Sequence, residues 1–316
     1  MFYCHLMHLL NRSDIRALEA IYDGGDRLAG IAGALDLSLQ RTSVILSGLA
    51  RKGLVEKRRR GMSETIGFAG SRSAHLFREL LHRGFPAGEC LSDSKLTVLS
   101  VLGGNGGSLE AQEVAAFSGL AGSTVRDCLR AGLGRGVVKR TGSAYAISSR
   151  MGTLSAFLKS YEEDIAGRAV GAISETAIVH MMFGFDIVFS IPAGGNAGGS
   201  APTATTAFFG DGLQTRGNRD YYHHVAGGRR LRREDFVMDN LLLEPGNIQN
   251  LMISLIYLKL HRRKINAKYL GLLARVYGVT SMGDMMLRYI GGEEIEGFPK
   301  QAEFARKYGM YGGPHG

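Results

Sequence analysis

A chain of 316 residues is long enough for two or three domains, each with its own hydrophobic core. Hydrophobic residues make up 45% of it, as in soluble globular proteins, and no run of about 18 apolar residues is present to span a membrane. The formal net charge of +9 favours a polyanionic partner. The 3 cysteines are widely spaced without a CxxC pair, which argues against a zinc site or a disulfide framework. We therefore expect a cytoplasmic protein without a membrane partner.

The stretch from Asn11 to Gly70 predicts three short helices followed by a β-hairpin. Apolar residues recur on one face of the first helix, and LAGIAGAL supplies the second. The third helix has an N-cap candidate at Ser38 and a glycine stop at Gly53. The apolar residues that we expect to form the buried face of this third helix are Leu39, Val44, Ile45 and Leu49.

Positive charge is concentrated directly after the third helix. From Arg51 to Arg60 six cations stand against Glu56 alone, and they lead into a Gly61-Met62-Ser63 turn and a second strand. A helix, a glycine stop and a basic hairpin form the order of a recognition helix followed by a wing. The stretch resembles the winged helix-turn-helix of MarR-type and related archaeal and bacterial regulators, and this resemblance implies binding to double-stranded DNA. Winged helices also bind proteins, so a protein-interaction module is the alternative.

The same order of elements recurs after a boundary near Pro86. One constant offset in numbering pairs Gly53 with Gly136 and Val55 with Val138 without a gap, so the chain carries two copies of one unit. The second copy predicts a recognition helix over residues 123–135 and a shorter wing over residues 137–147. Its positive charge is less concentrated, which leaves DNA contact and dimerisation as alternatives for this copy.

We expect DNA binding rather than catalysis. The residues predicted to contact DNA in the first copy are Ser38, Gln40, Arg41, Thr42, Ser43, Arg51, Lys57, Arg58, Arg59 and Arg60. Those predicted in the second copy are Ser123, Thr124, Arg126, Arg130 and Arg140. The N-terminal part of a recognition helix faces the bases, so residues 40–43 are the expected base readers. The wing arginines are expected to contact phosphates.

The composition changes after a helix predicted over residues 151–170. Residues 177–191 predict two buried strands or one bent strand, and four helices follow up to residue 290. The Gly-rich segment between them lacks the Lys of a P-loop, and only Asp211 follows Gly199-Ser200 where a nucleotidyltransferase needs two carboxylates. His223 and His224 are expected in a hairpin or at the surface, because neighbours on a strand face opposite ways. No catalytic residue, metal site or cofactor is predicted.

The patterns TAFF, RDYYHH, REDFVMDNLLLEPGN and LLARVYGV resemble the C-terminal domain of archaeal winged-helix proteins related to AbiEi-type antitoxins. The resemblance implies a regulator of its own promoter and a toxin-like protein partner. The predicted fold is mainly α with small β wings: two tandem winged helix-turn-helix domains and a C-terminal α/β (α+β) domain. The expected boundaries are 1–86, 87–150, a linker helix over 151–170, 171–290, and a flexible tail over 291–316. The pattern leaves open whether the chain forms a homodimer.

Overall fold

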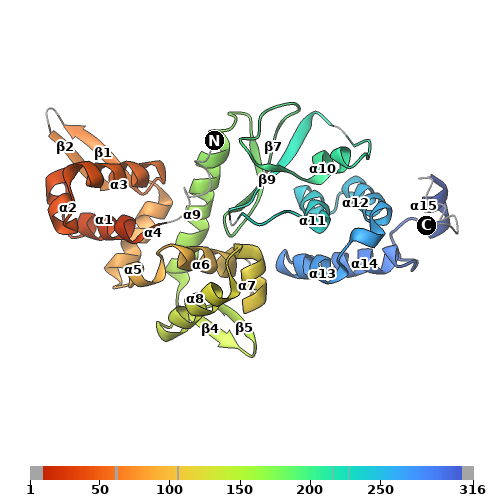
Figure 1. Ribbon diagram of the computed structural model, residues 1–316, viewed down its shortest axis with the longest axis horizontal. Helices are drawn as coiled ribbons and strands as arrows, with labels where there is room; N and C mark the ends of the chain where they lie inside the picture. The colour runs from red at the N-terminus through yellow and green to blue at the C-terminus, as the bar shows by residue number, and fades with distance from the viewer. Residues whose placement is uncertain (1–9, 61–62, 105–106, 216, 227, 308–316) are drawn as a thin grey trace. The chain divides into compact units, whose positions relative to one another are not determined.

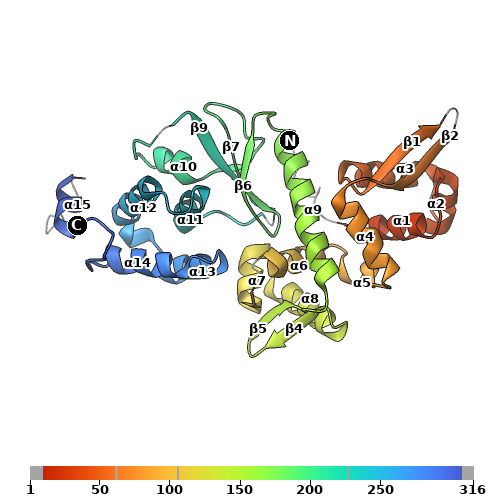
Figure 2. The same ribbon diagram turned by 180° about the vertical axis from the view of Figure 1, so that it is seen from behind.

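The computed structural model describes residues 10–60, 63–104, 107–215, 217–226 and 228–307 (Figures 1 and 2). The protein has a mixed α/β structure in which helices predominate and the sheets are small. The chain divides into two compact units. The first comprises the chain up to Glu175 together with Met182–Ile187 and Val225–Arg229, and the second comprises the remaining described residues.

The first unit begins with three helices and a two-stranded hairpin, which we call the first module. Its elements are α1 (Arg12–Tyr22), α2 (Leu28–Leu35), α3 (Leu39–Arg51), β1 (Val55–Arg60) and β2 (Ser63–Phe68). The hairpin is antiparallel, with Val55 opposite Phe68 and Lys57 opposite Ile66. Each element lies where the sequence pattern predicts it.

The second module repeats this order within the same unit. Its elements are α6 (Ser94–Gly104), β3 (Leu109–Glu110), α7 (Ala111–Ser118), α8 (Gly122–Gly134), β4 (Val138–Thr141) and β5 (Ala144–Ile147). The offset that pairs Gly53 with Gly136 also carries the bounds of α2 and α3 onto those of α7 and α8. The two helix pairs therefore have equal lengths and equal spacing, as the repeat in the sequence predicts.

Local interactions set the ends of these helices. The side chains of Asn11 and Asp14 form a reciprocal capping box at the start of α1, and the Ser38 hydroxyl accepts from the amide of Arg41 at the start of α3. Gly53 and Gly136 follow α3 and α8 with φ of 77° and 67°, a left-handed conformation that favours glycine. The predicted glycine stops are thus confirmed in both modules.

The modules also share a backbone link between the loop before the second helix and the hairpin. In the second module β3 pairs with β5, with Leu109 opposite Tyr145. In the first module the amide of Ile66 donates to the carbonyl of Asp26 at 2.8 Å. The offset between the modules aligns Asp26 with Leu109, so one hydrogen bond in the first module occupies the place of β3.

A long helix, α9 (Gly152–Gly171), packs against α4 (Arg72–His82) and α6 (Figures 1 and 2). The ring centroids of Phe77 and Phe157 lie 5.4 Å apart in an edge-on arrangement, and Phe157 stacks on Tyr161 at 5.5 Å. A short helix, α5 (Ala87–Cys90), precedes α6. The segment predicted as a linker therefore belongs to the core of the first unit.

The second unit contains most of a four-stranded sheet, with strand order β6-β7-β9-β8, and the C-terminal helices. The sheet strands are β6 (Ile178–Phe183), β7 (Asp186–Pro192), β8 (Ala201–Pro202) and β9 (Arg219–His224), with α10 (Ala204–Gly210) between the last two. Of the two alternatives for residues 177–191, the structure has two strands, β6 and β7, of which β7 is buried as predicted whereas β6 is mostly half-buried. The sequence pattern did not predict β8, β9 or α10, which lie in and beside the Gly-rich segment.

The C-terminal helices follow the predicted order. They are α11 (Arg233–Leu243), α12 (Ile248–Leu260), a short 3-10 helix η1 (Arg262–Lys264), α13 (Ala267–Val276), α14 (Thr280–Ile290) and α15 (Gln301–Lys307). The last one corrects the expected tail, because α15 is helical and Phe304 is buried against Tyr289, with ring centroids 5.7 Å apart. Residues 308–316 of the predicted tail lie outside the described residues. Within the described chain, no helix combines the length and apolarity needed to cross a bilayer.

Candidate nucleic-acid interface

The outward face of α3 carries three of the predicted contact residues. Gln40 and Arg41 are exposed in its first turn, and Arg51 is exposed in its last turn. Ser38 is exposed too, but its hydroxyl accepts the helix-capping hydrogen bond from Arg41 at 3.3 Å. Ser38 therefore caps the start of the helix.

Thr42 does not belong to this face, so its prediction as a base reader is wrong. The side chain is fully buried, and its hydroxyl donates to the carbonyl of Ser38 at 3.0 Å. Four consecutive helical residues span more than one turn and cannot all face a groove. Ser43, the next residue, is half-buried at the edge of the face.

The buried side of α3 also differs from the predicted one. Leu39 and Val44 were expected in the core, yet their exposed fractions are 53% and 66%. The buried residues are Thr42, Leu46 and Leu49, at spacings of four and three. The outward face is thus mixed, with Gln40 and Arg41 beside two exposed apolar side chains.

Three residues separate the hairpin from the end of α3. The amide of Leu54 donates to the carbonyl of Leu49 at 3.0 Å, so the end of the helix is bonded to the start of the hairpin. Arg58 and Arg59 are exposed on β1, and Arg58 pairs with Glu56. Lys57 lies 3.6 Å from Glu64 across the strands. Gly61, Met62 and the side chain of Arg60 lie outside the described residues.

Lys52 is a further correction to the predicted basic run. It lies at the C-terminal end of α3, and its Nζ donates to Oδ2 of Asp14 at 2.6 Å. The side chains of the pair are 11% and 4% exposed. Lys52 therefore ties α3 to α1 inside the first module and contributes little positive charge to the surface.

The second module exposes most of its predicted contact residues. Ser123, Arg126 and Arg130 are exposed on α8, whereas Thr124 is half-buried. Arg130 bonds to Asp127 at 2.8 Å, which satisfies part of its guanidinium within the helix. Arg140 donates to the carbonyl of Gly142 at 2.8 Å and lies over the ring of Tyr145 at 5.6 Å. Both modules therefore contain cations that are held by neighbouring groups, as Arg58 is in the first.

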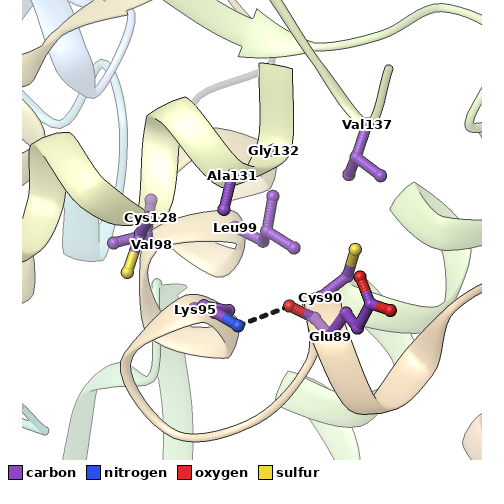
Figure 3. Close-up of a pocket in the computed structure, with 9 residues that line it drawn as sticks. All are labelled: Glu89, Cys90, Lys95, Val98, Leu99, Cys128, Ala131, Gly132 and Val137. Atoms are coloured by element: carbon purple, nitrogen blue, oxygen red, sulfur yellow. Dashed lines mark hydrogen bonds between the residues drawn. The ribbon is translucent and has the colours of Figure 1, made fainter. Parts of the chain in front are cut away.

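A small pocket lies beneath α8, between it and α5 and α6 (Figure 3). Cys90 and Cys128 line it together with Leu99, and the ammonium of Lys95 donates to the carbonyl of Glu89 at 2.6 Å. Burial raises the pKa of both thiols, so they remain protonated at neutral pH and are poor nucleophiles. The pocket is therefore a mostly apolar packing contact between α8 and the helices α5 and α6, and it is not a reactive centre.

Comparison with known proteins finds no protein-family model, no curated protein and no solved structure that matches the chain.

In the second unit, polar side chains are buried around α11. The imidazole Nδ1 of His223 lies 2.8 Å from Oδ2 of Asp239, and the Thr203 hydroxyl donates to the same oxygen at 2.5 Å. All three side chains are 1% exposed or less. The expectation that His223 lies at the surface or in a hairpin is therefore wrong, because it is buried on β9, which lies between β7 and β8 in the sheet. These groups link the sheet to α11 and have no exposed edge for a substrate.

Metal binding has no support in the described residues, where no group of three or more His, Cys, Asp or Glu side chains is placed to hold an ion. Two further polar residues of the sheet have structural partners. The imidazole of His180 lies 2.8 Å from the hydroxyl of Ser190, and Asp186 accepts from the amide of Ala226 at 2.9 Å.

Proposed function

We propose that the protein is a transcriptional regulator that binds double-stranded DNA through the first module, used as a winged helix. One observation carries the proposal: exposed Gln40, Arg41 and Arg51 on α3 lie in the same module as exposed Arg58 and Arg59 on the hairpin that follows. A helix with a polar outward face, joined to a basic hairpin, matches the docking geometry of such domains. The second module is proposed as a second winged helix with a weaker charge.

In this proposal α3 enters a major groove with its N-terminal turn toward the bases. Arg41 has the donors for a bidentate contact to guanine, and Gln40 has the donor and acceptor for adenine. Val44, which is 66% exposed between them and Arg51, supplies an apolar contact of the kind that thymine methyl groups accept. Arg58 and Arg59 contact phosphate and fix the register of the helix.

The test measures the affinity of the full chain for duplex DNA at several salt concentrations, after genome-wide mapping has identified a bound fragment. We expect the double variant Arg58→Ala and Arg59→Ala to bind all DNA sequences more weakly. The slope of log affinity against log salt concentration should become shallower by about 1 to 2, because each lost phosphate contact removes about 0.9 from it. Arg41→Ala is expected to cost about 1–3 kcal/mol on the mapped fragment and less on other DNA.

The control variant removes the same charge elsewhere in the first unit. Arg72 and Arg78 are exposed on α4, so replacing both with Ala leaves the proposed interface intact. An unchanged salt slope for the hairpin variant, or an equal loss in the control, would contradict the proposal.

A second candidate function is an antitoxin-like interaction in which α3 docks onto a protein partner. The exposed apolar side chains of Leu39 and Val44 favour it, because neighbouring exposed apolar residues are typical of protein-binding surfaces. A stoichiometric partner that co-purifies from native cells and is lost with Val44→Asp would support this function. Retention of that partner, together with loss of DNA binding in the same variant, would favour the regulator.

A further inference from the structure

The second unit carries a group of exposed cations that the proposed interface does not use. They come from the segment before α11, from η1 and from the first turn of α13. We call this group the η1 surface, and its members are Arg230, Arg232, Arg262, Arg263, Lys264 and Lys268.

Contacts between α11 and α13 bring these segments together. The amide of Asn266, the N-cap of α13, donates to the carboxylate of Glu234 in the first turn of α11. The guanidinium of Arg232 lies 4.6 Å from the ring centroid of Tyr269, whose hydroxyl donates to Asp235 at 3.1 Å. The starts of both helices therefore lie next to each other, and η1 directly precedes the start of α13 in the chain.

Two acidic side chains of this region are buried, whereas its cations are exposed. Glu234 and Asp235 are 2% and 1% exposed and are held by the contacts just described. Asp211 accepts from the hydroxyl of Tyr257 at 2.5 Å and lies 3.4 Å from Nη2 of Arg233. Within the described residues, none of the six members of the η1 surface forms an ion pair with a carboxylate.

Burial is the main reason that two neighbouring groups resist protonation. It lowers the pKa of His261, and the positive charges of Arg233 and Lys264 lower it further. Burial also lowers the pKa of Lys259, and the charge of Arg262 adds to the effect. Like charges thus contribute to both pKa shifts after burial.

We propose that the η1 surface binds the phosphate backbone of duplex DNA without reading its sequence. Exposed cations spread over three elements suit an extended polyanion, which presents a phosphate about every 3.4 Å along each strand. Long flexible side chains at the surface supply phosphate contacts and carry no base-specific geometry. This function goes beyond the proposed role of α3 and does not require it.

The test uses the full chain and a fluorescent 30-base-pair duplex of arbitrary sequence, with anisotropy measured from 50 to 300 mM NaCl. The variant carries Arg262→Ala, Arg263→Ala and Lys264→Ala together. We expect its log–log salt slope to flatten by about 2 to 3, at about 0.9 for each lost phosphate contact, and its affinity at 100 mM salt to fall at least tenfold. All three residues are exposed, so the thermal midpoint should stay unchanged.

The matched control removes three exposed cations from α14, the loop after it and α15: Arg288→Ala, Lys300→Ala and Arg306→Ala. If the η1 variant loses no affinity, or loses only as much as the control variant, the inference is overturned. Lys268→Ala is a second variant and should flatten the slope by about 1. If the η1 variant instead loses binding to vesicles containing phosphatidylserine while keeping its DNA slope, the surface is a lipid site and the inference is wrong.

The α3 proposal and the η1 inference fail in different ways. Loss of DNA binding in the Arg58 and Arg59 variant, with no change in the η1 variant, removes only the η1 inference. A flattened slope in the η1 variant, with an unchanged hairpin variant, removes only the α3 proposal. Each variant therefore tests one of the two hypotheses.

Discussion

Lys52→Met should destabilise the first module strongly, because it leaves a buried carboxylate without its cation. The ammonium of Lys52 lies 2.6 Å from Asp14, and the two side chains are 11% and 4% exposed. Removing one partner of a buried ion pair costs about 3–5 kcal/mol. A protein typically loses about 1–3 kcal/mol of stability per molar urea, so the unfolding midpoint should fall by at least about 1 M.

The second module supplies the control at the equivalent position. Arg135 aligns with Lys52 under the offset between the modules and pairs with Glu89, but these side chains are 51% and 55% exposed. Arg135→Met should therefore cost about 0–1 kcal/mol. The assay is urea denaturation followed by far-UV circular dichroism for both variants.

A double variant isolates the buried charge as the cause. Asp14→Asn keeps a side-chain oxygen for the capping box of α1 but removes the negative charge. Combined with Lys52→Met, it should be more stable than Lys52→Met alone. If Lys52→Met stays within about 1 kcal/mol of the natural chain, or costs no more than Arg135→Met, the reasoning is refuted.

Two other predictions concern pH and backbone conformation. Burial raises the pKa of Glu162 from 4.5 to about 8, so between those values the folded chain keeps a proton that the unfolded chain releases. Stability should therefore fall as pH rises through this window, and Glu162→Gln should reduce the fall by about 1.4 kcal/mol per pH unit in denaturation series; an unchanged pH profile would contradict this. Gly53→Ala should cost about 1–2 kcal/mol from its φ of 77°. Gly136→Ala should cost about the same in the same assay, because its φ is 67° and a Cβ at Gly53 would meet only the movable guanidinium of exposed Arg168; a negligible cost for either variant would contradict the argument from φ.

The helices of the two modules could be predicted from the sequence because periodicity, caps and glycine stops agree there. The orientation of α3 was missed, although the repeat contains the signal for it. Under the offset between the modules Thr42 aligns with Val125 and Val44 aligns with Asp127. Val125 is buried and Asp127 is exposed, as are their counterparts in α3. The aligned copies thus indicate which side of α3 is buried, whereas the periodicity of one short helix does not.

Most of the features that the sequence did not predict depend on contacts between residues that are far apart in the chain. The bond between Lys52 and Asp14 joins residues 38 positions apart, and the members of the His223 and Asp239 pair come from a strand and a helix. Neither pairing has a local pattern that a sequence argument can detect. The strand β9 was missed because glycines and polar residues precede it, although tertiary contacts place it within the sheet.

The two modules have helices of equal length but hairpins of unequal reach. Each strand of the first hairpin has 6 residues and each strand of the second has 4. At about 3.3 Å per residue, the first extends about 7 Å farther from its helices than the second. That difference is close to the width of about 6 Å of a DNA minor groove. If both modules lie against one duplex at equal depth, only the longer hairpin of the first module is able to extend across the neighbouring groove.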